Sequence, residues 1–140
     1  MKILNCTPHE ICIFEDAVYI SEHRKYFIEP GKTKLVTIIP PSGTLLNVHH
    51  ETELLPSIFY ECPVNGEVMI PVITQRIQDI DPIPDDADII IVSNQYASAA
   101  VALNLPNVDK LYTIAHPVYE RTSSGSIRPI GCLGLRKVKP

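Results

Sequence analysis

The sequence predicts an α+β fold, with a mostly antiparallel, short-stranded β-sheet and one short alanine-rich helix packed on it. Thirteen prolines are spread along the 140 residues and interrupt almost every long segment, which disfavours long helices. Short runs of β-branched and apolar residues alternate with turn dipeptides, as in an all-β chain. Only the segment Ser93–Leu105 has the composition of a helix.

Composition predicts one soluble domain covering residues 1–140. Hydrophobic residues make up 45% and charged residues 20% of the chain, which excludes wholesale disorder. The net charge of −4 argues against binding to duplex nucleic acid, because that surface needs an excess of Lys and Arg. The apolar runs are far shorter than the roughly 20 residues that span a bilayer. The start has no apolar signal-peptide core, so we expect a cytoplasmic protein that has no membrane partner.

Turn signals place the first strands. Residues 2–7 and 10–21 form two β runs around a turn at Pro8, and a Pro-Gly turn at Pro30 and a Pro-Ser-Gly turn at residues 40–43 separate further strands. The Asn65-Gly66 dipeptide predicts a hairpin with a type I′ turn, because it lies between two alternating runs.

The second half predicts a strand, a helix and a strand. The apolar run Ile89–Val92 precedes the helix, which Ser93 or Asn94 can cap and which Asn104 and Pro106 can end. Residues 109–120 then form a strand candidate. A Ser/Gly turn leads into the closing strand, where Pro129 favours an edge or an irregular position.

Two arginines, Arg121 and Arg128, stand on either side of this Ser/Gly turn. If the flanking segments form a hairpin, both guanidinium groups can lie on one rim and bind a diphosphate. The alternative is that both side chains are solvated. Tyr96, Tyr112 and Tyr119 offer rings on which a purine could stack, or they belong to the core. The Ser93-Asn94 junction can hold an anion at the helix start, or only cap the helix.

No residue pattern identifies a catalytic or metal site. The four cysteines form no CxxC pair, and His49 and His50 alternate across a strand, so no metal and no cofactor are expected. Cys6, Cys132, His9 and His116 are the available material for a cysteine-histidine enzyme, but their spacing is not diagnostic. The Thr7-Pro8-His9 bend is either a binding corner or a capped turn.

Four segments together resemble a family of small bacteriophage and prophage proteins. These segments are "LNCTPHEI" (4–11), "PPSGT" (40–44), "IIIVSNQYASAAV" (89–101) and the ending "HPVYER…PIGCLGL" (116–135). The chain is similar to the Thoeris anti-defence sponges, which bind signals of the cyclic ADP-ribose type without cleaving them. It departs from that pattern in extra residues around "AVYISEHRKYFIEPGK" and at Leu133, where an arginine often follows the cysteine.

The resemblance implies a non-catalytic protein that sequesters a cyclic nucleotide in a pocket at a subunit interface. It implies a homo-oligomer, a dimer or larger, and some relatives also take up cyclic oligonucleotides. Arg121 matches the family's arginine, and Arg128 is a second candidate. The expected ligand-binding residues are Arg121, Arg128, Asn94, Ser93, Tyr96 and Tyr119. Two alternatives stay open: a small phosphodiesterase or cysteine hydrolase that degrades such a signal, and a phage accessory module that binds protein.

Overall fold

The computed structural model describes residues 1–139, and the chain divides into two compact units. The main unit consists of residues 1–46 together with those from 82 onward, and the hairpin unit consists of residues 47–81. This division does not decide whether residues 1–140 form one domain, so the single domain stays a prediction. The elements of the main unit are β1 (Ile3–Asn5), β2 (Ile11–Glu15), β3 (Val18–Ile20), β4 (Lys25–Phe27), β5 (Lys34–Ile39), β8 (Ile89–Ile91), α1 (Asn94–Ala102), a 3-10 turn (Val108–Lys110), β9 (Leu111–Arg121) and β10 (Ile127–Lys137).

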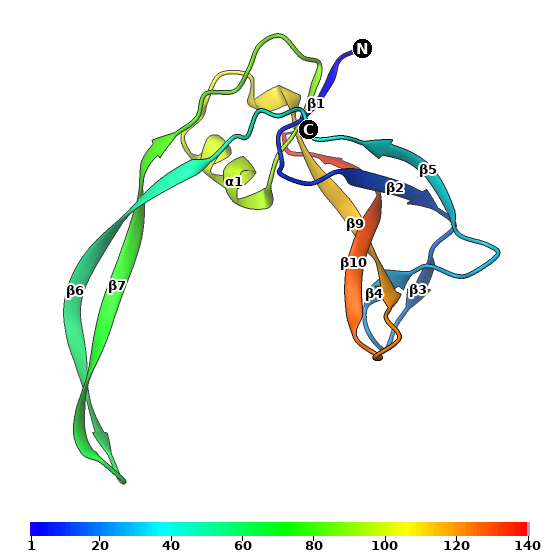
Figure 1. Ribbon diagram of the computed structural model, residues 1–140. Coiled ribbons are helices and arrows are strands. Elements are labelled where there is room, and N and C mark those ends of the chain that lie inside the picture. The colour runs from blue at the N-terminus through cyan, green and yellow to red at the C-terminus, as the bar shows by residue number, and fades with distance from the viewer. Residues whose placement is uncertain (140) are drawn as a thin grey trace. The chain divides into compact units, whose positions relative to one another are not determined.

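The main unit is built on one eight-stranded sheet with the order β1-β8-β9-β10-β2-β5 (Figure 1). Strands β9 and β10 are the longest strands of this sheet, and they pair antiparallel along almost their whole length. The other edge of β9 pairs with β8 near its start and with β4 near its end. The small β3-β4 hairpin therefore joins the sheet at the far end of β9.

The expectation of a mostly β chain with a single α-helix is confirmed for the described residues, but the antiparallel character of the sheet needs correction. Four strand pairs are parallel: β1 with β8, β8 with β9, β4 with β9, and β2 with β10. For β8 and β9 the reason is the crossover through α1, which returns the chain to the same end of the sheet before β9 begins. The sheet is therefore mixed.

Helix α1 begins where the sequence indicates and ends at Ala102, before the expected Leu105. Ser93 is the N-cap residue, and its hydroxyl accepts a hydrogen bond from the backbone N–H of Tyr96 at 3.2 Å. Asn104 follows the last turn with a φ of 50°, a left-handed conformation that Asn tolerates well at helix ends. The buried face of the helix consists of Tyr96, Ala97, Ala99 and Ala100, and the helix contacts β9.

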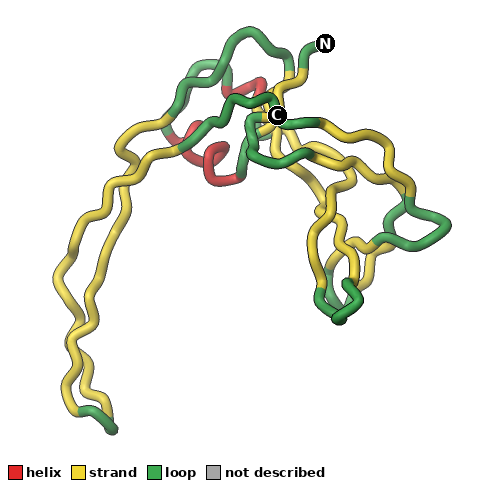
Figure 2. Tube along the Cα trace, in the orientation of Figure 1, coloured by secondary structure: helices red, strands yellow, loops and turns green. Residues whose placement is uncertain are grey.

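Both hairpins that the turn residues predict are present. Strands β9 and β10 pair across the Ser/Gly turn, with Ile127 opposite Arg121, and the pairing shifts between Pro129 and Gly131 as expected near a proline. The loops at the tips of the hairpins are visible in Figure 2.

The core of the main unit lies where the central strands meet. Ile90, Ile91, Leu111, Val118 and Cys132 are fully buried, and each comes from a strand of the central sheet. Ile83 and Ala87 of the proline-rich loop after the hairpin unit are also buried, so this loop contributes apolar side chains to the core.

The hairpin unit is a two-stranded antiparallel ribbon of β6 (Val48–Cys62) and β7 (Gly66–Ile80). Cys62 pairs with Gly66 across a loop of three residues, and Gly66 has a φ of +73° while Asn65 has no positive φ. A type I′ turn needs positive φ at both central residues. The hairpin is therefore confirmed, but the type of its turn is not the one expected.

Candidate functional site

The Thr-Pro-His bend is organised by Asn5, whose side chain is buried. Its Oδ1 accepts hydrogen bonds from the backbone N–H of Thr7 at 3.0 Å and from the Thr7 hydroxyl at 2.6 Å. Its Nδ2 donates to the carbonyl oxygens of His9 at 2.8 Å and Ile39 at 3.2 Å. One buried amide thus closes the turn after β1 and ties it to β5.

The Pro-Ser-Gly turn is attached to the same place. The backbone N–H and the hydroxyl of Ser42 each lie 2.8 Å from the carbonyl oxygen of Asn5 and donate to it. The Ser42 hydroxyl also accepts a hydrogen bond from the backbone N–H of Thr44 at 3.3 Å. Two segments that are about 35 residues apart therefore form one rigid corner.

A pocket of about 480 Å³ lies between this corner, the start of α1 and the irregular stretch of β10. Its polar lining residues include Thr7, His9, Glu10, Ser93 and Asn94, while the remaining lining is largely apolar. The other lining residues are Ile11, Cys12, Val92, Thr113, Ile114, Pro129, Ile130 and Gly131. We call this the α1 pocket. A mainly apolar cavity with a few convergent polar groups is typical of sites for small molecules.

The start of α1 supplies the α1 pocket with an electropositive end. The first backbone N–H groups of a helix have no partner within the helix, and the helix dipole adds partial positive charge there. Ser93 and Asn94 are exposed at this end, and the first turn contains no acidic residue. An anionic group in the pocket would be stabilised by this helix terminus.

The two arginines of the β9-β10 hairpin do not form a pair. Arg128 lies opposite Glu120 in the strand register, whereas Arg121 lies opposite Ile127. Successive side chains alternate across a strand, so Arg121 and Arg128 lie on opposite faces. The expected clamp on a single rim is therefore not present within one chain. Arg128 instead forms an ion pair with Glu120.

Arg121 is held by an aromatic cluster at the end of β9. Its Nη2 donates to Nε2 of His23 at 2.9 Å, and its guanidinium lies 5.5 Å from the centre of the Phe27 ring. It lines a depression of about 270 Å³ together with Ile20, Phe27, Ile28, Pro30 and Glu120. One edge of Arg121 is thus occupied by its own chain.

The two tyrosines among the six expected ligand-binding residues have different surroundings. Tyr96 is only 1% exposed, so its ring offers no face to a ligand and packs in the core. Tyr119 is half-buried and lines a depression of about 420 Å³ with Tyr19, Tyr26, Arg24 and others. Of the six expected ligand residues, the structure brings only Ser93 and Asn94 into the α1 pocket.

Sequence reasoning missed Ile130 and Gly131 as parts of the α1 pocket. A Cβ atom on Gly131 would lie 2.5 Å from the carbonyl oxygen of Cys12 and 2.5 Å from the ring of Phe14. The glycine permits this close approach of β10 to β2, and the Pro-Ile-Gly sequence beside the register shift was the available signal. Thr7 and His9 were singled out as a capped turn or a binding corner; they form the capped turn and also line the α1 pocket, while binding there stays a prediction.

The buried cysteines do not carry an activated thiol. Burial raises the pKa of the Cys6 thiol and of the Cys132 thiol above their ordinary values. Among residues 1–139 no group of three His, Cys, Asp or Glu side chains is placed to hold a metal ion.

The chain matches no protein-family profile, no curated protein and no solved structure. None of the helices within residues 1–139 is long and apolar enough to cross a membrane.

Proposed function

We propose that the protein is a phage anti-defence protein that binds a cyclic nucleotide immune signal, of the cyclic ADP-ribose type, in the α1 pocket and holds it without cleaving it. The observation that carries the proposal is the convergence of separate segments on one cavity. The Thr-Pro-His turn, the start of α1 and the Pro-Ile-Gly stretch line the pocket, and the Pro-Ser-Gly turn supports it through Asn5. These are the segments on which the resemblance depends.

The dimensions and chemistry of the pocket suit this ligand class. Its volume of about 480 Å³ lies within the range of roughly 300 to 1,000 Å³ that small-molecule sites occupy. The apolar lining favours a flat base, Asn94 can donate and accept hydrogen bonds, and the helix start favours a phosphate. Cyclic oligonucleotides share these features and are further candidate ligands.

No lysine or arginine lines the α1 pocket within one chain. A diphosphate needs cationic partners, so we propose that an arginine from a neighbouring subunit of a homo-oligomer completes the site. Arg121 is the first candidate, because it is exposed and is not engaged by a carboxylate in the described residues. Arg128 is the second, although its ion pair with Glu120 would have to open.

A sequestering protein acts by mass action and needs tight binding without chemistry. The raised pKa of the buried Cys6 and Cys132 thiols opposes their use as nucleophiles, which favours sequestration over a cysteine hydrolase. The protein is mixed with cyclic ADP-ribose and its isomers, then denatured by heat. Return of intact ligand is expected, whereas its loss would establish the degrading enzyme. If no cyclic nucleotide in a screened panel raises the melting temperature of the protein, the alternative of a module that binds protein would be favoured.

Two substitutions locate the site by calorimetry. Asn94→Ala removes a polar group from the pocket, and we expect affinity to fall at least tenfold, about 1.4 kcal/mol. Gln95→Ala, the next residue along the helix, lies outside the pocket lining and is the matched control. Arg121→Ala should also lower affinity at least tenfold if it completes the site, with Arg76→Ala in the hairpin unit as its control. Unchanged affinity in either variant removes that residue from the site.

A further inference from the structure

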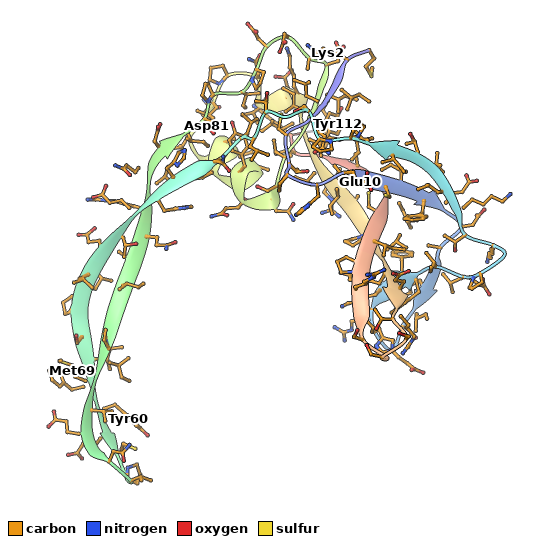
Figure 3. The ribbon with its side chains drawn as sticks, viewed as in Figure 1. Lys2, Glu10, Tyr60, Met69, Asp81 and Tyr112 are labelled. Atoms are coloured by element: carbon orange, nitrogen blue, oxygen red, sulfur yellow. The ribbon has the colours of Figure 1, made fainter. Side chains whose placement is uncertain are left out.

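The hairpin unit leaves an unusual amount of apolar surface uncovered. Nine large hydrophobic residues between Leu54 and Ile73 are 43–88% exposed. Tyr60 and Met69 are labelled on the distal part of this ribbon in Figure 3, where their side chains project from the strands. If a large apolar side chain presents about 200 Å² when fully exposed, the nine present on the order of 1,000 Å². Because these residues are divided between the two faces of the ribbon, each face presents about 500 Å², which is at the upper end of the largest apolar patch of a typical monomer, roughly 300 to 600 Å².

The apolar residues occupy both faces of the ribbon. Leu55 with Val72, Ile58 with Ile70, and Tyr60 with Val68 are cross-strand pairs on one face. Leu54 with Ile73 and Phe59 with Met69 are pairs on the other face. A two-stranded sheet with one buried face alternates apolar and polar residues, and this ribbon does not. We call residues 54–60 and 68–73 the apolar arm.

An isolated two-stranded hairpin is marginally stable in water at best. A partner that covers the apolar residues of the hairpin must therefore be present whenever the chain folds. A second copy of the same chain meets this condition, because it is made together with the first. We propose that the apolar arm is the oligomerisation surface of the protein, packed by its faces against a second copy.

Charge and area both fit contact between copies. The apolar arm contains no charged residue, so copies can meet there without burying a charge. Glu61 and Glu67 lie beyond it towards the tip, and an antiparallel arrangement of two arms keeps these carboxylates of the two copies apart. A stable interface buries about 800 Å² on each partner, of which roughly 60% is apolar, so one apolar face of about 500 Å² with its polar rim is sufficient.

The backbone of the arm favours packing by faces over extension of the sheet at its edges. Pro56 and Pro71 lie within β6 and β7, and neither has an N–H to donate to an added strand. The pairing also shifts between Leu55 and Ile58, which is a bulge. Prolines and bulges are common devices against edge pairing.

The test measures the mass of the full chain in solution by light scattering and sedimentation across a range of concentrations. We expect the unmodified protein to assemble. Ile70→Asp and Met69→Asp place one charge on each face of the arm, and the double variant should weaken assembly at least a hundredfold. Thr74→Asp adds the same charge to the same strand outside the arm and should leave the mass unchanged. All three substituted side chains are exposed in the single chain, so the fold of each variant should persist by circular dichroism.

Two results would overturn the proposal. The first is an unmodified protein that stays monomeric up to about 100 µM, which would indicate a different partner for the arm. The second is a double variant that assembles as the unmodified protein does. Loss of assembly in only one single variant would support the proposal and identify the face that carries the contact.

Discussion

The main unit and the hairpin unit place their apolar residues in opposite environments. In the main unit, Ile90, Leu111 and Val118 are fully buried, and parallel and antiparallel strands close around them. In the hairpin unit, Leu54 is 79% exposed and Phe59 67% exposed. Similar sequence patterns therefore produce a core in one region and an uncovered surface in the other. The difference is the number of strands, because two strands alone cannot enclose a core.

The largest expected effect comes from a substitution in the core of the main unit. Ile90→Ala removes a fully buried side chain, and we expect the free energy of unfolding to fall by about 3 to 4 kcal/mol. Leu54→Ala, measured at concentrations low enough for single chains, should change it by less than about 0.5 kcal/mol. Chemical denaturation followed by circular dichroism gives both values. Similar losses in the two variants would show that the hairpin is covered in the single chain.

A second prediction concerns buried polar groups. Asn5→Ala deletes four hydrogen bonds around the Thr-Pro-His turn and leaves buried partners unsatisfied, so we expect a loss of about 2 to 3 kcal/mol. Asn47→Ala is the control in the hairpin unit, because Asn47 bonds to Asp81 through its backbone N–H and carbonyl oxygen, which the substitution keeps. Thermal melts of the two variants should differ by several degrees. Equal melting temperatures would contradict a structural role for the Asn5 amide.

A third prediction tests the closeness of packing within β10. Gly131→Ala forces a Cβ against the Cys12 carbonyl oxygen and the Phe14 ring, and we expect a loss of about 1 to 3 kcal/mol. Gly134→Ala lies in the same strand with nothing within 4 Å of its added Cβ, so it should be nearly neutral. Because Gly131 lines the α1 pocket, the first variant should also lose ligand affinity, as calorimetry would show. A neutral Gly131→Ala would mean that β2 and β10 can separate at little cost.

The smallest effect compares the thiols of the two units. The backbone N–H groups of Asn65 and Val64 lower the pKa of the Cys62 thiol, whereas burial raises the pKa of Cys6 and Cys132. With alkylating reagent and mass spectrometry, Cys62 should react at lower pH than the other two, which need unfolding. Cys62→Ser should remove the early product, and early labelling of Cys132 would contradict the buried core.

The raised thiol pKa values also give a direction for stability. In the folded chain the pKa values of Cys6 and Cys132 lie above the ordinary thiol value of 9.0, so the unfolded chain loses these two protons at lower pH than the folded chain does. The contribution of these two thiols to the free energy of unfolding is therefore intact below pH 9.0. It is lost as the pH rises through the pKa values of the thiols in the folded chain.

Local chemistry made part of this fold predictable. Ser93 and Asn104 mark the helix ends, and the Ser/Gly turn and Asn65-Gly66 mark two hairpins, because capping and turn formation depend on neighbours in sequence. The parallel pairing of β1 with β8 joins Leu4 to Ile90 and could not be seen from either segment alone.

The candidate site was less predictable for the same reason. Ser93 and Asn94 were identified from the helix start, but their neighbours in the pocket come from distant strands. Arg121 and Arg128 appeared equivalent beside one turn, and only the register separates them onto two faces. The burial of Tyr96 likewise depends on the packing of α1 against the sheet, which ring chemistry does not indicate.

The ends of the hairpin unit meet each other, and this gives the chain a modular construction. The backbone N–H of Asp81 donates to the carbonyl oxygen of Asn47, and the N–H of Asn47 donates to the Asp81 carboxylate at 2.8 Å. An insertion whose two ends are joined in this way can be shortened by matched pairs of residues while the path of the main chain outside it stays the same. Hairpins of different length could therefore be exchanged between residues 47 and 81. The resulting proteins would share the same main unit, and under the proposal for the apolar arm each would assemble only with copies that have an arm of matching length.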